Sequence, residues 1–88
     1  MTELEIEQML IDNGCEHAAY FTNPSYDTAI VGVTNDDRVV YDYDKMVKFL
    51  VDTEGWTEME SIEWIEINAM RTLPFMGSQS PIIMYKLI

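Results

Sequence analysis

TAIVGVTNDDRVVYDYDKMVKFL, residues 28–50, is the most informative part of this chain about its fold. The β-branched run from Thr28 to Val33 is typical of a buried strand, and Gly32 within it indicates a bulge or a close backbone approach. The Asn35-Asp36-Asp37 segment predicts a turn, and residues 39–41 predict the strand that returns from it. Together these residues predict an antiparallel hairpin.

A helix is expected to follow the hairpin directly. Asp42 or Asp44 is placed to cap its first turn, because aspartate oxygens accept hydrogen bonds from the free N–H groups at a helix start. Apolar residues at positions 46, 47, 50 and 51 give the helix one apolar face. Gly55 predicts its end.

Two capping boxes locate the other helices. In the first, Thr2 and Glu5 are three residues apart ahead of an apolar stripe, and Gly14 supplies the stop. In the second, Thr57 and Glu60 have the same spacing and open a third helix. Its expected core stripe consists of Met59, Ile62, Ile65, Ala69 and Leu73.

The last segment, residues 82–87, is almost wholly apolar and predicts a strand that is central or covered on both faces. The element order is therefore helix, two strands, two helices and a strand. We expect a small α+β fold, a single domain over residues 1–88. Its hairpin and C-terminal strand share one sheet, with helices packed on it.

The charge of the chain restricts its partners. Its 88 residues carry a formal net charge of −11, from 16 acidic and five basic side chains. Nucleic acids and anionic membranes usually bind clustered basic surfaces, so we expect neither as a direct partner. A protein partner with a basic surface fits better. No apolar run approaches the roughly 20 residues that span a bilayer, and the acidic N-terminus is unlike a signal peptide. We therefore expect the cytoplasm.

The motifs of catalysis are missing from the sequence. It contains no glycine-rich phosphate loop, no G-x-S-x-G elbow and no H-E-x-x-H metal motif. Cys15 and His17 are the only cysteine and the only histidine, too few ligands for a zinc site within one chain. We expect no enzyme activity, no catalytic residue and no cofactor.

Four aspartates in the 28–50 stretch leave one alternative open. Asp36, Asp42 and Asp44 could serve a metal-dependent enzyme or regulator, although they lack the spacing, glycine and terminal glutamate of a calcium loop. Turn formation by Asp36 and Asp37 and helix capping by Asp42 or Asp44 explain the same residues without a metal. We predict no metal site.

The third helix carries the strongest binding signal. If Ile62, Ile65 and Ala69 face the core, Trp64 points nearly the opposite way. An exposed tryptophan near an arginine is the composition of an interaction hot spot; the alternative is that Trp64 packs beneath the final strand or the 15–27 segment. The predicted partner-binding residues are this helix face and the charged hairpin tip: Trp64, Asn68, Arg71, Glu60, Asp36 and Asp37.

Three segments resemble short conserved proteins encoded by bacteriophages and prophages of Firmicutes. They are AIVGVTNDDRVVYDYDKMV, EWIEINAMRTLP and PIIMY, and with their spacers they cover residues 23–85. The chain departs from that pattern at Asp37, where glycine is common. The resemblance implies a phage origin, and hence the host-cell cytoplasm, with no established activity to transfer.

These observations lead to three hypotheses. The first is an acidic phage-type accessory protein that binds another protein, in a sharper form an inhibitor that imitates DNA toward a host nucleic-acid-binding or defence protein. The second is a structural or assembly role as a homo-oligomer, for example a homodimer. The third is the metal-dependent alternative at the aspartates.

Overall fold

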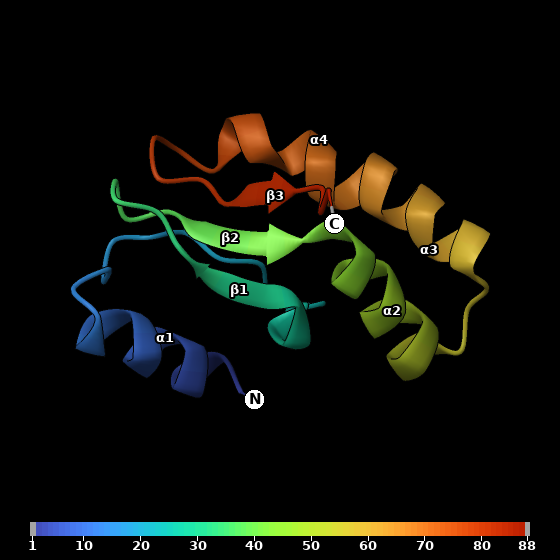
Figure 1. Cartoon of the computed structure of the whole chain (residues 1–88), viewed down its shortest axis with the longest axis horizontal. Coiled ribbons are helices and arrows are strands. Elements are labelled where there is room, and N and C mark those ends of the chain that lie inside the picture. The colour runs from blue at the N-terminus through green and yellow to red at the C-terminus, as the bar shows by residue number, and fades with distance from the viewer. Residues whose placement is uncertain (1, 88) are drawn as a thin grey trace.

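The computed structural model describes residues 2–87 and confirms the predicted α+β class (Figure 1). No helix among these residues is long and apolar enough to cross a membrane. The elements in chain order are α1 (Glu3–Asp12), η1 (Asp27–Ala29), β1 (Ile30–Val33), β2 (Val39–Asp42), α2 (Tyr43–Glu54), α3 (Glu58–Trp64), η2 (Ile65–Ala69), α4 (Met70–Thr72), η3 (Leu73–Phe75) and β3 (Ile82–Met84).

The three strands form one mixed sheet in the order β1-β2-β3. β1 and β2 pair antiparallel as the predicted hairpin, and their register shifts between Ile30 and Gly32, so the glycine does mark an irregularity of the strand. β3 pairs parallel with β2, Val40 opposite Ile82. The expectation that the final strand is central or doubly covered is wrong. β1 occupies the other side of β2, which leaves β3 at an edge with its three side chains half-buried.

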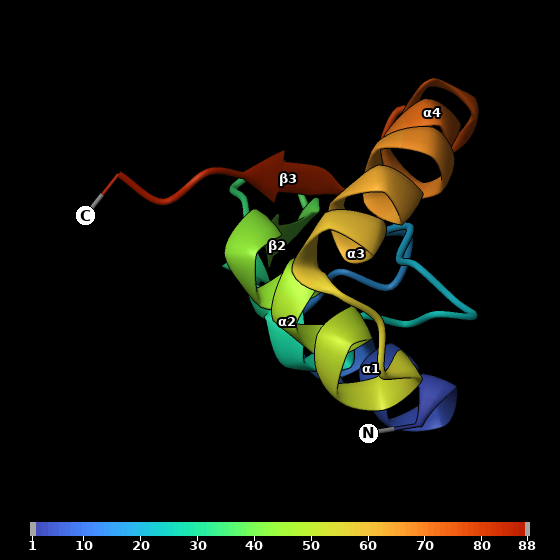
Figure 2. The same ribbon diagram turned by 90° about the vertical axis from the view of Figure 1, so that its right-hand side faces the viewer.

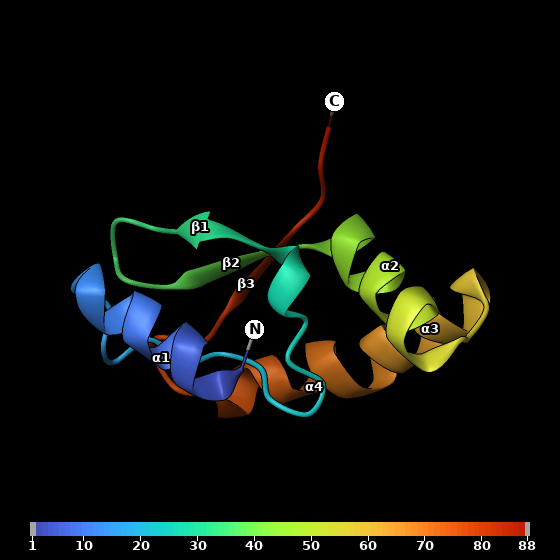
Figure 3. The ribbon, with the colours of Figure 1, turned by 90° about the horizontal axis from the view of Figure 1, so that it is seen from below.

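The helices cover one side of the sheet. Figures 2 and 3 show α1 and the run from α3 to α4 on the same side of the strands, with the long connection of residues 13–26 between them. α2 leaves the end of β2 and joins the α3–α4 run at one end of the molecule (Figure 1). This arrangement confirms the predicted packing of helices on a shared sheet.

Local capping signals set the helix boundaries as expected. Both capping boxes form, Thr2 with Glu5 and Thr57 with Glu60. Asp42, and not Asp44, caps α2: its carboxylate accepts a hydrogen bond from the backbone N–H of Lys45. Gly55 ends α2 with φ 70°, a left-handed conformation that side chains other than glycine rarely adopt.

The third helix departs from its predicted stripe. Ile65 and Ala69 are buried, but Met59 is 78% exposed because the first turn of α3 extends past the sheet at one end of the molecule (Figure 1). Directly after Trp64 the helix widens to π-helical geometry over η2. Such widened turns occur often at functional sites.

An aromatic cluster lies in the core between the sheet and the helices. The Phe21 ring packs on Tyr26 and on Tyr41, with centroids 5.6 and 4.9 Å apart, and Tyr26 also packs on Phe49 at 5.7 Å. Phe21 and Tyr26 come from the long 13–26 connection, which has no regular strand. The connection is therefore anchored by aromatic burial rather than by a backbone ladder.

Candidate functional site

Two tryptophans pack against each other on the helical side of the molecule. Trp56 precedes the cap of α3 and Trp64 is its last residue, with ring centroids 5.2 Å apart and planes tilted by 53°. Trp56 is half-buried, and Trp64 is 39% exposed. Trp64 thus faces outward only in part, and one side of its ring contacts another aromatic side chain.

The turn between α2 and α3 positions this pair. Gly55 reverses the chain in the left-handed conformation, and Thr57 starts the next helix two residues later. The backbone N–H of Thr57 donates to Glu60 Oε1 at 3.0 Å, and the N–H of Glu60 donates to Thr57 Oγ1 at 3.1 Å. Trp56 is held between these two fixed points and lies against the Trp64 ring.

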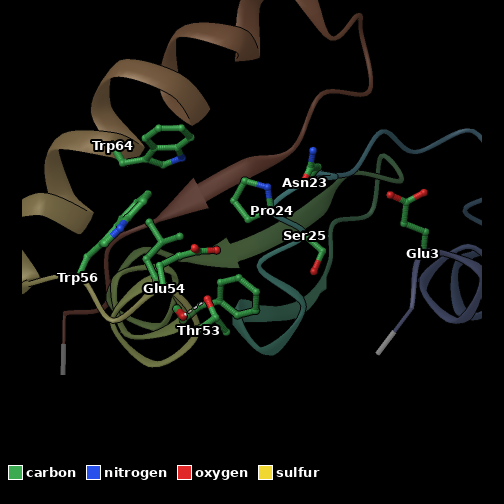
Figure 4. Close-up of a pocket in the computed structure, with 10 residues that line it drawn as sticks. Glu3, Asn23, Pro24, Ser25, Thr53, Glu54, Trp56 and Trp64 are labelled. Carbon is green, nitrogen blue, oxygen red and sulfur yellow. Dashed lines mark hydrogen bonds between the residues drawn. The ribbon is translucent and has the colours of Figure 1, made fainter.

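An open cleft of about 730 Å³ lies beside the pair. Figure 4 shows Trp64, Trp56 and Glu54 on one side of it, residues 23–25 facing them, and Glu3 at the far end. The cleft therefore lies between the α2–α3 turn and the loop that carries the cis peptide bond of Asn23 and Pro24.

Two smaller hollows adjoin this cleft. One, of about 380 Å³, lies on the outer side of the pair and is lined by Trp56, Trp64, Glu60, Glu63, Ile67 and Asn68. The other, of about 180 Å³, lies at the foot of Trp64 against the 21–26 segment. Trp64 lines all three hollows, and we refer to them together as the tryptophan groove.

The tryptophan groove is acidic. Its lining includes the carboxylates of Glu3, Glu54, Glu60 and Glu63, and no lysine or arginine of the described chain lines any of the three hollows. The hydrogen bond from the Thr57 backbone N–H lowers the pKa of Glu60 below its ordinary value. At neutral pH the groove therefore presents aromatic faces beside ionised carboxylates.

Tyr26 lies beneath Trp64 and is 1% exposed. Its φ of 50° is left-handed, which is unusual for a bulky side chain. Its hydroxyl makes no hydrogen bond of regular geometry with a described residue, although the Trp64 indole N–H lies close to it. Burial raises the pKa of Tyr26 to about 12, and the interaction of its hydroxyl with the Trp64 indole N–H acts in the opposite direction. The groove thus has beneath it a neutral hydroxyl that is not paired in a regular hydrogen bond.

The structure brings together three of the six predicted partner-binding residues. Glu60, Trp64 and Asn68 line one hollow, and Asn68 Nδ2 donates to the backbone oxygen of Trp64 at 3.0 Å. Arg71 is exposed further along the same helical run and lines none of the three hollows.

The hairpin tip lies apart from the groove. In Figures 1 and 3 the turn between β1 and β2 and the helix α3 are at opposite ends of the molecule. Asp36 is exposed and accepts a hydrogen bond from the Thr34 hydroxyl. Asp37 is half-buried and lies 3.6 Å from the Cys15 thiol, whose pKa is raised by burial and by this carboxylate. The tip and the groove are two separate surfaces.

The three aspartates of the metal-dependent alternative do not converge. Asp36 is in the hairpin turn, whereas Asp42 and Asp44 lie at the other end of β2 and in the first turn of α2. Asp42 is 3% exposed and committed to capping. Within residues 2–87 no group of three histidine, cysteine or acidic side chains is arranged to hold a metal ion.

Sequence reasoning missed Trp56, Tyr26 and the 23–25 loop as parts of the site. Trp56 is half-buried and belongs to the part-exposed pair with Trp64. The one usable signal was the spacing of the two tryptophans across a helix start. Nothing in the order of residues indicates that Tyr26, 38 positions before Trp64, lies beneath it.

A scan of protein-family models found no match to this chain, and comparisons with curated proteins and with solved structures found none either.

Proposed function

We propose that this chain is a small acidic accessory protein that binds a basic segment of a partner protein in the tryptophan groove. The observation that carries the proposal is the packed, part-exposed pair of Trp56 and Trp64 at the meeting point of three hollows. Tryptophan is among the residues that contribute most to binding at protein interfaces. It is also the best aromatic partner for a lysine or arginine cation.

Charge complementarity selects the kind of partner. Glu54, Glu60 and Glu63 border the tryptophans without a neighbouring cation in the groove lining. A basic segment would neutralise these carboxylates and place its cations over the indole faces. The whole-chain charge of −11 adds a long-range attraction that speeds the encounter.

The resemblance to short phage and prophage proteins of Firmicutes supports a more specific form of the proposal. A phage-encoded protein of this size and charge suits inhibition of a host nucleic-acid-binding or defence protein, because the basic site that such a protein uses for DNA accepts carboxylates as well. The glutamates that line the groove and the other acidic side chains of α3 supply the negative charge that an inhibitor resembling DNA requires.

Capture from a Firmicutes cell lysate tests the proposal. Immobilised wild-type protein is expected to retain a partner with a basic surface at low salt and to release it as salt is raised, because screening weakens exposed charge pairs. The matched baits are Trp64→Ala, which removes the part-exposed indole, and Phe75→Ala, which removes a more exposed ring outside the groove. Retention by Phe75→Ala together with loss by Trp64→Ala supports the proposal, whereas equal retention by all three baits contradicts it.

A second candidate function, assembly with copies of itself, is favoured by the edge strand β1. Val31 and Val33 on this strand are 43% and 44% exposed, and an uncovered edge strand is a template for pairing with another chain. Sedimentation at rising protein concentration tests it. A concentration-dependent dimer that Val31→Lys abolishes supports self-assembly, and a monomer throughout the series rules it out.

A further inference from the structure

The small hollow at the foot of Trp64 has chemistry of its own. Its volume of about 180 Å³ lies between residues 21–24 and the helical run. An engineered apolar cavity of about 150 Å³ holds one benzene molecule, so this hollow has room for one side-chain head group rather than for a peptide. It is a candidate subsite within the tryptophan groove.

Tyr26 supplies an observation that a packed core does not explain. Its side chain is almost completely buried and lines this hollow, yet its hydroxyl makes no hydrogen bond of regular geometry, although the Trp64 indole N–H lies close to it. A buried hydroxyl without a regular hydrogen bond is destabilising. By comparison, the equally buried Tyr41 hydroxyl accepts a hydrogen bond from the Phe21 backbone N–H at 2.9 Å.

The polar groups around the hollow are mainly free acceptors. Asn68 uses its Nδ2 to donate to the Trp64 backbone oxygen, which leaves its Oδ1 open. The Thr72 hydroxyl already donates to the backbone oxygen of Ala69. Beyond Trp64, the carboxylate of Glu63 makes no ion pair with any described residue. A ligand with many hydrogen-bond donors and no acceptors therefore fits the polar groups around the hollow.

We propose that the hollow is an arginine subsite, in which a partner's guanidinium stacks on the Trp64 indole and donates hydrogen bonds to Tyr26 Oη and Asn68 Oδ1. The guanidinium presents five N–H donors in one plane and no acceptor, and it stacks on aromatic faces, whereas a lysine ammonium is a compact point charge. This proposal rests on the proposed function and specifies which basic side chain the groove selects.

Trp64 controls access to the subsite. The Tyr26 hydroxyl is out of contact with solvent while the indole lies beside it. A guanidinium that donates to Tyr26 Oη takes the place of the Trp64 indole N–H there, so the Trp64 ring shifts when it binds. Binding of arginine is accordingly expected to change the tryptophan fluorescence of the pair.

The experiment compares three peptides that have blocked ends, a fluorescein label and the same lysine-glycine sequence. They differ only at the central residue, which is arginine, lysine or citrulline. Citrulline keeps the shape of arginine and removes its charge. Anisotropy titrations at low salt use the wild type and Tyr26→Phe, which loses only the hydroxyl. We expect the arginine peptide to bind the wild type about tenfold more tightly than the lysine peptide, because stacked, charge-assisted hydrogen bonds form only with arginine. In Tyr26→Phe the ratio is expected to fall to about two or below.

The outcomes separate this inference from the proposed function. Equal binding of the arginine and lysine peptides, lost for both in Trp64→Ala, overturns the arginine subsite and leaves the groove as a general basic site. An arginine preference that persists in Tyr26→Phe also overturns it, with thermal unfolding confirming that the variant is folded. Absence of binding by every peptide contradicts both proposals.

Discussion

At the scale of single residues, two buried tyrosines with different environments explain how the groove is supported. Tyr41 is inaccessible to solvent and its hydroxyl is paired with the Phe21 backbone, which ties the 13–26 connection to β2. Tyr26 is equally buried, but its hydroxyl makes no hydrogen bond of regular geometry. The first hydroxyl stabilises the fold, and the second is the one that our proposal assigns to the arginine of a partner.

The matched substitutions Tyr41→Phe and Tyr26→Phe are expected to have different effects on stability. Tyr41→Phe leaves the buried Phe21 N–H without its acceptor, so we expect a loss of about 1–3 kcal/mol in the free energy of unfolding. Tyr26→Phe removes a hydroxyl without a regular hydrogen bond and is expected to leave that free energy unchanged or to raise it by about 1 kcal/mol. Urea unfolding measures both. A large loss in Tyr26→Phe would show that its hydroxyl has a structural partner.

The same two side chains predict a loss of stability at alkaline pH. Burial raises the pKa of Tyr26 and that of Tyr41 to about 12 from an ordinary value near 10. The folded state therefore holds these protons more tightly than the unfolded state does. The contribution of these two groups to the free energy of unfolding is fully present below pH 10. It is lost as the pH rises toward 12, by about 2–3 kcal/mol for each tyrosine. Urea midpoints between pH 8 and 12 measure the decline, which should be smaller in Tyr26→Phe. A flat profile would contradict this explanation.

At the scale of elements, the sequence was informative wherever structure depends on neighbouring residues. Both capping boxes, the Gly32 irregularity and the Gly55 helix end were predicted, because each depends on hydrogen bonds or backbone angles within a few positions. The parallel pairing of β3 at the edge was not predicted, since its partner β2 lies some 40 residues earlier. The π-helical η2 also lacked a signal, because its residues fit an ordinary helical stripe equally well.

The start of α3 offers a test at this scale. Thr57→Ala removes the capping hydroxyl that receives the Glu60 N–H, and we expect it to lower the free energy of unfolding by about 1 kcal/mol. It should also loosen Trp56 against Trp64 and change the tryptophan fluorescence of the folded protein. Thr28→Ala, an exposed threonine whose hydroxyl caps no helix, is the control. Equal effects of the two substitutions would contradict a role for this cap in positioning the pair.

At the scale of the whole molecule, the groove is assembled from segments that are far apart in the sequence. Sequence periodicity placed Glu60, Trp64 and Asn68 on one helix face, and the structure gathers them in one hollow. The other parts of the groove come from α1, α2 and the 21–26 segment, and their approach to that face depends on tertiary packing. For this reason no local pattern indicated them. The predicted contribution of the hairpin tip stays a prediction.

Two double substitutions with the same change in net charge locate the binding surface. Glu60→Gln with Glu63→Gln neutralises the rim of the groove, and Asp36→Asn with Asp37→Asn neutralises the hairpin tip at the opposite end (Figure 1). We expect the rim variant to weaken binding of a basic peptide about tenfold and to reduce its salt dependence, and the tip variant to change it less than about twofold. Anisotropy titrations at two salt concentrations measure both. The reverse order would assign binding to the tip.

Binding in the tryptophan groove is tested by the affinity of the arginine-centred basic peptide for three proteins at low salt. These are the wild type, Trp64→Ala, and Phe75→Ala, whose ring is 89% exposed and outside the groove. Loss of an interface tryptophan typically costs at least about 2 kcal/mol, or about thirtyfold in affinity. The predicted result is a loss of that size in Trp64→Ala and wild-type affinity in Phe75→Ala. Equal affinity of all three proteins, or the larger loss in Phe75→Ala, would contradict the assignment of binding to the tryptophan groove.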